Sequence, residues 1–132
     1  MKTAIPFNRP YISDNCHTYI QKVLSLQLSG DGYFTNKCSQ FLEQYFSAER
    51  ALLTTSCTHA LEMCSILLNL KRGDEVIVPS YTFVSTINAF VMSGVKPIFA
   101  DIKKDTLNID EDSVESLITE KTRAIDLDAQ SF

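Results

Sequence analysis

Apolar and polar positions follow two patterns along the chain, one typical of helices and one typical of buried strands. Apolar residues spaced three and four apart predict two helices before residue 50 and three more that begin near residues 56, 82 and 110. Short apolar runs predict strands at residues 51–55, 75–78, 97–100 and 122–125. Strand and helix therefore alternate from residue 51 onward, which is typical of an α/β fold with a mostly parallel sheet and helices on both faces.

Candidate capping residues and apolar stripes define the predicted helices more closely. Ser13 and Thr35 are placed to cap the first two helices, and Asp110 or Asp112 to cap the last. We expect the third helix to end near residues 72–74, and the fourth, over residues 82–93, to end at Gly94. Each apolar stripe should face the sheet. The stripes are Cys38, Phe41, Leu42 and Tyr45; Ala60, Leu61, Cys64, Leu67 and Leu68; and Val114, Leu117 and Ile118.

Composition and charge narrow the class of protein. The chain has 132 residues, 45% of them apolar and 21% charged, which suits one modest hydrophobic core. Its formal net charge of -4 offers no basic surface for nucleic acid. Apolar runs are shorter than the roughly 20 residues of a membrane span, and the start of the chain lacks an apolar signal segment. We therefore expect a cytoplasmic protein without nucleic-acid or membrane partners.

The metal-binding residue types form no metal-site pattern. The four cysteines, Cys16, Cys38, Cys57 and Cys64, are widely spaced, and only His17 and His59 accompany them. We expect reduced thiols on apolar faces and no metal site.

A first candidate site lies where the strand at residues 51–55 leads into the next helix. Thr54, Thr55, Ser56 and Thr58 gather there, beside the free N–H groups and positive dipole end of a helix N-terminus. A phosphate group fits such a place. The alternative is that Ser56 or Thr58 only caps the helix.

A second candidate site follows the strand at residues 75–78. Pro79 and Ser80 break that strand, and Tyr81 and Phe83 lie just beyond it, where a flat ring could stack. The alternative is that Phe83 is a core residue on the first turn of its helix. Since ligands of parallel sheets bind at the carboxyl ends of strands, the two places together indicate a phosphorylated aromatic ligand. Neither GxGxxG nor GxxxxGK[ST] occurs.

These same residues resemble a known family. Residues 56–63 (SCTHALEM) and 73–86 (GDEVIVPSYTFVST) resemble the pyridoxal-phosphate (PLP) dependent sugar-nucleotide aminotransferases of the DegT/DnrJ type. The resemblance extends over residues 5 to about 125, including residues 5–8 (IPFN) and 106–110 (TLNID). Within the family it is strongest to the transaminases that convert dTDP-4-keto-6-deoxyglucose to dTDP-4-amino-4,6-dideoxygalactose, a precursor of enterobacterial surface polysaccharide.

The resemblance implies a fold, a cofactor and site residues. It implies the large domain of the PLP-transferases, the aspartate aminotransferase-like fold type I. Thr58 and the backbone of His59 would bind the phosphate of pyridoxal 5'-phosphate, and Phe83 would stack on its ring. Because His59 replaces a residue that is commonly small, its side chain should point outward. An amino donor and a 4-keto sugar nucleotide would be the substrates, and full-length members would be homodimers.

The family's Schiff-base lysine has no counterpart here. It lies beyond the matched segment in the family, and none of the lysines present matches its motif, so we assign no catalytic residue. Residues 126–132 are similar to the pattern around the acidic partner of the pyridinium nitrogen, but the spacing is one residue short and no site residue is assigned there. We expect residues 1–132 to be the N-terminal segment of a large domain, truncated and without its C-terminal domain, and inactive alone.

Three other interpretations stay open. The chain could be a non-catalytic fragment that binds PLP or a sugar nucleotide, which saturable binding without turnover would favour. It could be a small independent α/β nucleotide-binding protein, which a folded monomer indifferent to PLP would favour. A nonfunctional truncated gene product would instead aggregate or be degraded, because its apolar helix faces would lack partners.

Overall fold

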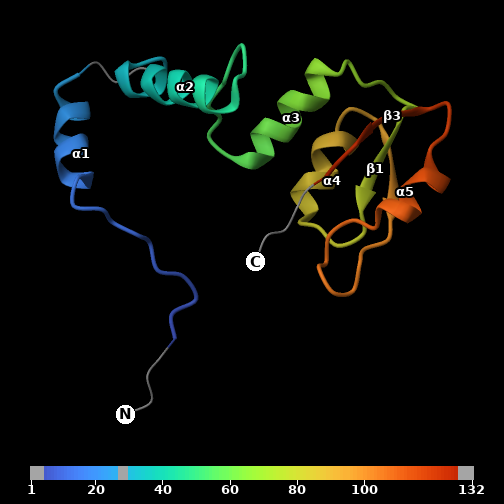
Figure 1. The fold of residues 1–132 in the computed structure, drawn as a ribbon. Helices are drawn as coiled ribbons and strands as arrows, with labels where there is room; N and C mark the ends of the chain where they lie inside the picture. Colours follow the sequence, from blue (N-terminus) through green and yellow to red (C-terminus); the bar gives the residue numbers. More distant parts are fainter. Residues whose placement is uncertain (1–4, 27–29, 128–132) are drawn as a thin grey trace. The chain divides into compact units, whose positions relative to one another are not determined.

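The computed structural model describes residues 5–26 and 30–127 and divides the chain into two compact units (Figure 1). The first unit, Met1–Leu53, contains helices α1 (Cys16–Leu24) and α2 (Tyr33–Phe46). The second unit, Thr54–Phe132, contains the sheet and three helices. Among the described residues, no helix combines the length and the apolar character needed to cross a membrane.

Both predicted caps of the first unit are wrong. Helix α1 begins after Asn15, and Ser13 instead offers its carbonyl oxygen to the N–H of Cys16 at 3.0 Å. Helix α2 begins after Gly32, whose extended backbone turns the chain into the helix, so Thr35 lies inside its first turn. Neither cap position has a side-chain hydrogen bond. Backbone geometry therefore sets where both helices start, against the preference for a hydroxyl cap.

The predicted apolar stripe of α2 is present and largely exposed within the first unit. The rings of Phe41 and Tyr45 stack with centroids 5.9 Å apart, Cys38 beside them is exposed, and Leu42 is half-buried. The predicted strand at residues 51–55 is wrong. Residues 51–54 have no regular structure and pair with no strand of the described sheet, and Leu52 and Leu53 are exposed.

A parallel sheet of three strands forms the centre of the second unit, which confirms the predicted α/β class. Strands β1 (Glu75–Pro79), β2 (Lys96–Ala100) and β3 (Thr122–Ile125) lie in the order β2-β1-β3. Both neighbours run parallel to β1. All three strands lie where the apolar runs predicted them.

The central strand is covered on both of its faces. Val76 and Val78 share one face and pack with Phe90 and Val95 in the core, whereas Ile77 points to the opposite face. All three side chains of the strand are fully buried. The uninterrupted apolar run at residues 76–78 therefore belongs to a strand that is buried on both faces.

Helices α3 (Cys57–Leu67), α4 (Val84–Val91) and α5 (Glu111–Leu117) complete the second unit. Asp110 caps α5, as predicted, by accepting the N–H of Asp112 at 3.3 Å. Helix α4 lies within its predicted range, and Gly94 follows it with a φ of +79° that favours glycine. Val114 and Leu117 of α5 are half-buried, whereas Ile118, which was also predicted to point inward, is exposed.

The inward face and the end of α3 differ from the prediction. Leu61 packs against the core, but Cys64, Leu67 and Leu68 are exposed. Ser65, which is not part of the predicted apolar stripe, is buried, and its hydroxyl lies 2.7 Å from that of Ser93 beyond α4. A small hydroxyl residue lets two helices approach closely where a leucine could not. The helix ends at Leu67 rather than near residues 72–74, because Asn69 adopts a left-handed φ of 51°.

A buried carboxylate joins β1 to the chain before β3 at the amino end of the sheet. Glu75 is buried, accepts the hydroxyl hydrogen of Thr119 at 2.7 Å and lies 3.5 Å from the ammonium group of Lys96. The hydrogen bond from Thr119, assisted by the charge of Lys96, lowers the pKa of Glu75. A carboxyl group with a lowered folded-state pKa stabilises the fold above its unfolded-state pKa, and this contribution is lost as the pH falls through the folded-state value.

We therefore predict that Glu75→Gln destabilises the chain at neutral pH and flattens the loss of stability on acidification below about pH 5. Urea unfolding measured across the acid range tests this. Glu120→Gln, at an exposed carboxylate on the same edge of the sheet, is the matched control and should keep the parent profile. An unchanged acid profile in Glu75→Gln would show that this bond contributes nothing.

Candidate cofactor-binding site

The N-terminus of α3 is built from hydroxyl residues that bond to one another. Ser56 has an extended backbone, and its Oγ accepts the N–H of His59 at 3.2 Å, so Ser56 is the helix cap. The hydroxyl of Thr54 donates to the carbonyl oxygen of Ser56 at 2.8 Å. The capping interpretation of the hydroxyl cluster is thus confirmed for Ser56, and it leaves the rest of the turn available.

Further donors lie at the same N-terminus. The first-turn N–H groups of an α-helix have no carbonyl partner within the helix, and the Ser56 cap takes only that of His59. Those of Cys57 and Thr58 point out of the N-terminus together with the positive end of the helix dipole. The Thr58 side chain is half-buried and belongs to the same turn. These groups form a donor set suited to an anion.

The side chain of His59 is exposed, as predicted, but it does not extend freely into solvent. Its Nδ1 lies 2.5 Å from the Oγ1 of Thr55, so the imidazole folds back over the helix N-terminus. The sequence predicted a role only for the backbone of His59. The contact of its side chain with Thr55 could have been expected, because the two residues are four apart and lie on either side of the helix start.

The second candidate site contains Phe83, which is the N-cap residue of α4. Its carbonyl oxygen accepts the N–H of Thr86 at 3.0 Å, and its side chain is 69% exposed. The interpretation of Phe83 as a core residue is therefore wrong. The loop before it is attached to the sheet, because the N–H of Ser80 donates to the carbonyl oxygen of Ala100 at 2.9 Å. Tyr81 in this loop is also exposed.

Both helix N-termini lie at the carboxyl end of the sheet. Helices α3 and α4 pack together, and Figure 1 shows them running in the same direction, opposite to β1. The Ser65 and Ser93 hydroxyls meet at the C-terminal end of the pair. Ser56 precedes Ser65 by as many residues as Val84 precedes Ser93, so both N-termini lie at the opposite end of the helix pair. The structure thus places Thr58, His59 and Phe83 at one end of the second unit; their binding roles stay predictions.

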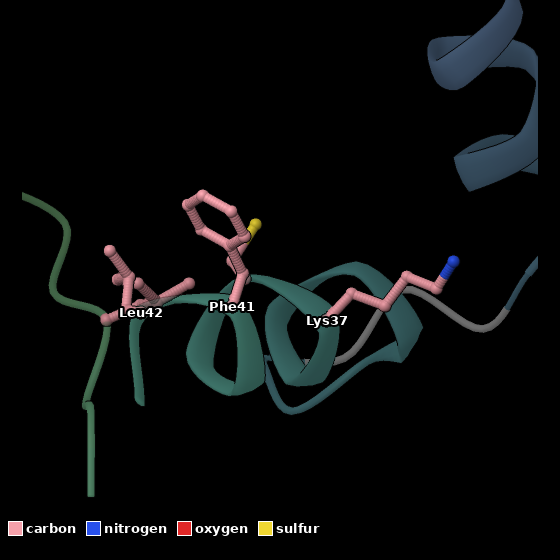
Figure 2. A pocket seen from close by; sticks show the side chains of 5 residues that line it. Lys37, Phe41 and Leu42 are labelled. Carbon is pink, nitrogen blue, oxygen red and sulfur yellow. The ribbon is translucent and has the colours of Figure 1, made fainter. Parts of the chain in front are cut away.

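A groove in the first unit is a further place where a small ligand could bind, but its lining offers few polar groups. A groove of about 410 Å³ in the first unit is lined by Lys37, Cys38, Phe41, Leu42 and Leu53. Figure 2 shows Phe41 and Leu42 projecting from α2 while Lys37 extends along it, which makes the groove mainly apolar. Within residues 5–26 and 30–127, no three His, Cys, Asp or Glu side chains gather as a metal site would need.

The acidic segment at the end of the chain is only partly described. Asp126 follows β3, and its N–H donates to the carbonyl oxygen of Ile77 at 2.8 Å. Residues 128–132, the remainder of the segment that is similar to the family's acidic pattern, lie outside the described residues.

Comparison with known proteins defines the class of protein. The sequence pattern of the DegT/DnrJ/EryC1/StrS aminotransferase family matches residues 10–127, and the chain belongs to that family. A relative is the uncharacterised protein MJ1066 of Methanocaldococcus jannaschii, 36% identical over 124 residues, which are 94% of this chain and 32% of that protein.

Solved structures of similar fold agree with this assignment. Spr1654 of Streptococcus pneumoniae, described as a sugar aminotransferase and solved in its PMP form, is 33% identical with a TM-score of 0.84 over 92% of this chain and 31% of that one. The Escherichia coli GDP-4-keto-6-deoxy-D-mannose-3-dehydratase with bound hydrated PLP is 28% identical with a TM-score of 0.82, over 91% of this chain and 32% of that one. The chain thus spans about a third of the length of these relatives.

The Ser56 cap allows a direct test of how the N-terminus of α3 is held. We predict that Ser56→Ala lowers the free energy of unfolding by about 1 kcal/mol, because the N–H of His59 loses its acceptor. Urea unfolding measures the change. The matched control is Ser116→Ala on α5, where the hydroxyl bonds only to the Ser113 carbonyl oxygen of its own helix; it should change stability little. Equal effects of the two substitutions would contradict a capping role for Ser56.

Proposed function

We propose that this chain is the N-terminal segment, residues 1–132, of the large domain of a PLP-dependent sugar aminotransferase, and that it binds the cofactor at the N-termini of α3 and α4. One observation carries the proposal: a capped, donor-rich helix N-terminus and an exposed aromatic ring occur at the same end of a parallel sheet. Membership of the aminotransferase family supports it, as do similar structures in PLP and PMP forms.

The donors at α3 fit a phosphate ester. Its oxygens would accept the N–H groups of Cys57 and Thr58 and the hydroxyl hydrogen of Thr58. The N–H of His59 would join them when the phosphate replaces Ser56 Oγ as its acceptor. A doubly charged phosphate is a stronger acceptor than a serine hydroxyl, so the exchange is favourable.

Phe83 fits the aromatic part of the ligand. Its ring is exposed at the start of α4, and the loop that carries it is attached to β2 through Ser80. Stacking would bury apolar surface of both the pyridine ring and Phe83, which favours binding. The phosphate group at α3 and the ring at Phe83 would then fix the cofactor at its two ends.

Membership of the aminotransferase family supports a proposal for the reaction of the whole protein. When bound, PLP supplies an electron sink for moving an amino group from a donor to a keto group. We propose a 4-keto-6-deoxy sugar nucleotide of the dTDP-4-keto-6-deoxyglucose type as acceptor and dTDP-4-amino-4,6-dideoxygalactose as product, a step towards surface polysaccharide, in a homodimeric cytoplasmic enzyme. The E. coli neighbour is named for a GDP-linked 4-keto-6-deoxy sugar, which supports this class of acceptor.

A second candidate is a fragment that binds PLP or a sugar nucleotide without catalysis. The absence of a lysine matching the family's Schiff-base motif favours it, because the covalent step needs that amine. This chain's residues would then hold and orient the cofactor only.

Binding of pyridoxamine 5'-phosphate tests the proposed site without interference from surface lysines, because this ligand has no aldehyde. We predict saturable binding at least about tenfold tighter than that of pyridoxamine, which lacks the phosphate. Phe83→Ala should weaken binding about fivefold through the lost stacking. Ligand fluorescence measures both effects.

Phe41→Ala, at an exposed phenylalanine of α2, is the matched control and should bind as the parent does. Equal affinity for the two ligands, or equal effects of the two phenylalanine substitutions, would sink the proposed site.

Turnover separates the two candidate functions. We predict that residues 1–132 alone, mixed with PLP, an amino donor and dTDP-4-keto-6-deoxyglucose, form no amino sugar above a protein-free control, because no matching amine is present to bind the cofactor covalently. Product analysis by mass spectrometry measures this. Steady turnover would overturn the prediction and would require an unrecognised lysine in the reaction.

A further inference from the structure

Strand β3 is attached to the sheet less firmly than β2, although both lie at edges of the described sheet. The pairing of β1 with β2 runs without interruption from Glu75 to Pro79, and α4 and α5 both contact β2. The pairing of β1 with β3 is shorter and shifts in register after Glu75. Such an irregularity interrupts the ladder of backbone hydrogen bonds. Among the described elements, β3 has extensive contacts with β1 alone, so it can leave the sheet at the lower cost.

Apolar burial contributes little to the attachment of β3. Half-buried and exposed residues alternate along the strand, and Ala124 is its one residue that packs against the core. An alanine side chain buries little apolar surface, whereas the central strand buries three branched side chains completely. Ile125 remains 40% exposed. Polar contacts must therefore supply much of what keeps β3 beside β1.

Two acidic residues at the amino end of β1 provide these polar contacts. The Glu75 carboxylate accepts the hydroxyl hydrogen of Thr119, and the N–H of Glu75 donates to the carbonyl oxygen of Lys121 at 2.9 Å. Oδ1 of Asp74 lies 3.5 Å from Nε of Arg123, the second residue of β3. These three contacts, which we call the amino-end latch, join β1 to β3 and to the segment that leads into it.

The strength of the latch depends on the ionised form of Glu75. The hydroxyl oxygen of Thr119 accepts the N–H of Lys121 at 3.1 Å, so its single hydrogen is directed to the Glu75 carboxylate at 2.7 Å. Hydrogen bonds to a charged acceptor are stronger than those to a neutral one. Protonation of Glu75 therefore weakens this bond and removes the attraction to Lys96, whose ammonium group lies 3.5 Å away.

The surroundings of Glu75 favour its ionised form. The hydrogen bond from Thr119 and the charges of Lys96 and Lys121 outweigh burial and lower the pKa of Glu75. The contribution of the latch is therefore complete above the ordinary glutamate pKa of about 4.3 and is lost as the pH falls through the lowered value. The charged groups near Glu75 are Lys96 of β2, Glu120 and Lys121 before β3, and the neighbouring Asp74, which is paired with Arg123 and accepts the N–H of Lys71.

We propose that β3 is an acid-released strand: protonation of Glu75 opens the amino-end latch, and residues 119–126 leave β1 while β1 and β2 stay paired. Release also breaks the hydrogen bond from the N–H of Asp126 to the carbonyl oxygen of Ile77 at the other end of the strand. The inference goes beyond the proposed function and is independent of it, because the latch lies at the amino end of the sheet and the candidate cofactor site at the carboxyl end.

Amide hydrogen exchange followed by NMR at pH 7.0 and 3.5 tests this inference. Protection factors, which correct for the intrinsic exchange rate at each pH, report the equilibrium between closed and open forms of each amide. The N–H of Ser80, which donates to the carbonyl oxygen of Ala100, reports the pairing of β1 with β2. We expect the protection of residues 123–126 to fall at least about threefold relative to that of Ser80 at pH 3.5.

Glu75→Gln should lower the protection of residues 123–126 already at pH 7.0 and leave little further fall at pH 3.5. Thr119→Val, which removes the donor to Glu75, should have the same effect, whereas Thr119→Ser keeps the hydroxyl and should retain the parent profile. Glu120→Gln, at an exposed carboxylate that lines the same hollow, is the matched control and should also retain it. Circular dichroism shows whether each variant folds.

The outcomes distinguish local release from opening of the whole sheet. An equal fall of protection at residues 123–126 and at Ser80 would overturn the separate release of β3. A fall confined to residues 123–126 that is the same in the parent and in Glu75→Gln would overturn the role of Glu75. A fall that disappears in Glu75→Gln and Thr119→Val, and persists in Thr119→Ser and Glu120→Gln, supports the inference.

Discussion

The pairing of β1 with a parallel strand on each side is the constraint on which the second unit depends. Parallel neighbours cannot be joined by tight turns, so the chain must return through a helix each time. Helices that return in this way start at the carboxyl end of the sheet. Val76, Ile77 and Val78 of β1 make this possible, because their apolar side chains can be buried on both faces of the sheet. Helix α4, with Phe83 before it, starts at that end for this reason, and α3 packs beside α4 and runs in the same direction (Figure 1).

The sequence predicted what depends on local apolar patterns and missed what depends on particular neighbours. The strands at residues 75–79, 96–100 and 122–125 and the cap at Asp110 follow from composition and spacing alone. The predicted strand at residues 51–55 failed because an apolar run becomes a strand only when it pairs with a neighbouring strand, and no pattern within five residues reveals whether it does. Ser13 and Thr35 failed because α1 begins after Asn15 and α2 after Gly32, where no side-chain hydrogen bond defines the cap.

The candidate site, too, was predicted from the sequence only in part. Ser56, Thr58 and Phe83 could be placed at helix N-termini from the order of strand and helix, and all three lie within the segment that matches the family. The inward position of Ser65 could not be predicted, because a hydroxyl is buried only where a partner such as Ser93 meets it. The contact between Thr55 and His59 was missed as well, since it depends on a side-chain rotamer and not on periodicity.

The hydroxyl pair of Ser65 and Ser93 has a mechanical consequence for the two helices that it joins. It joins α3 and α4 near their C-terminal ends, where Ser65 is buried and Ser93 is half-buried. The two hydroxyl oxygens lie only 2.7 Å apart, so a side chain larger than serine at either position would force the C-terminal ends of α3 and α4 to separate.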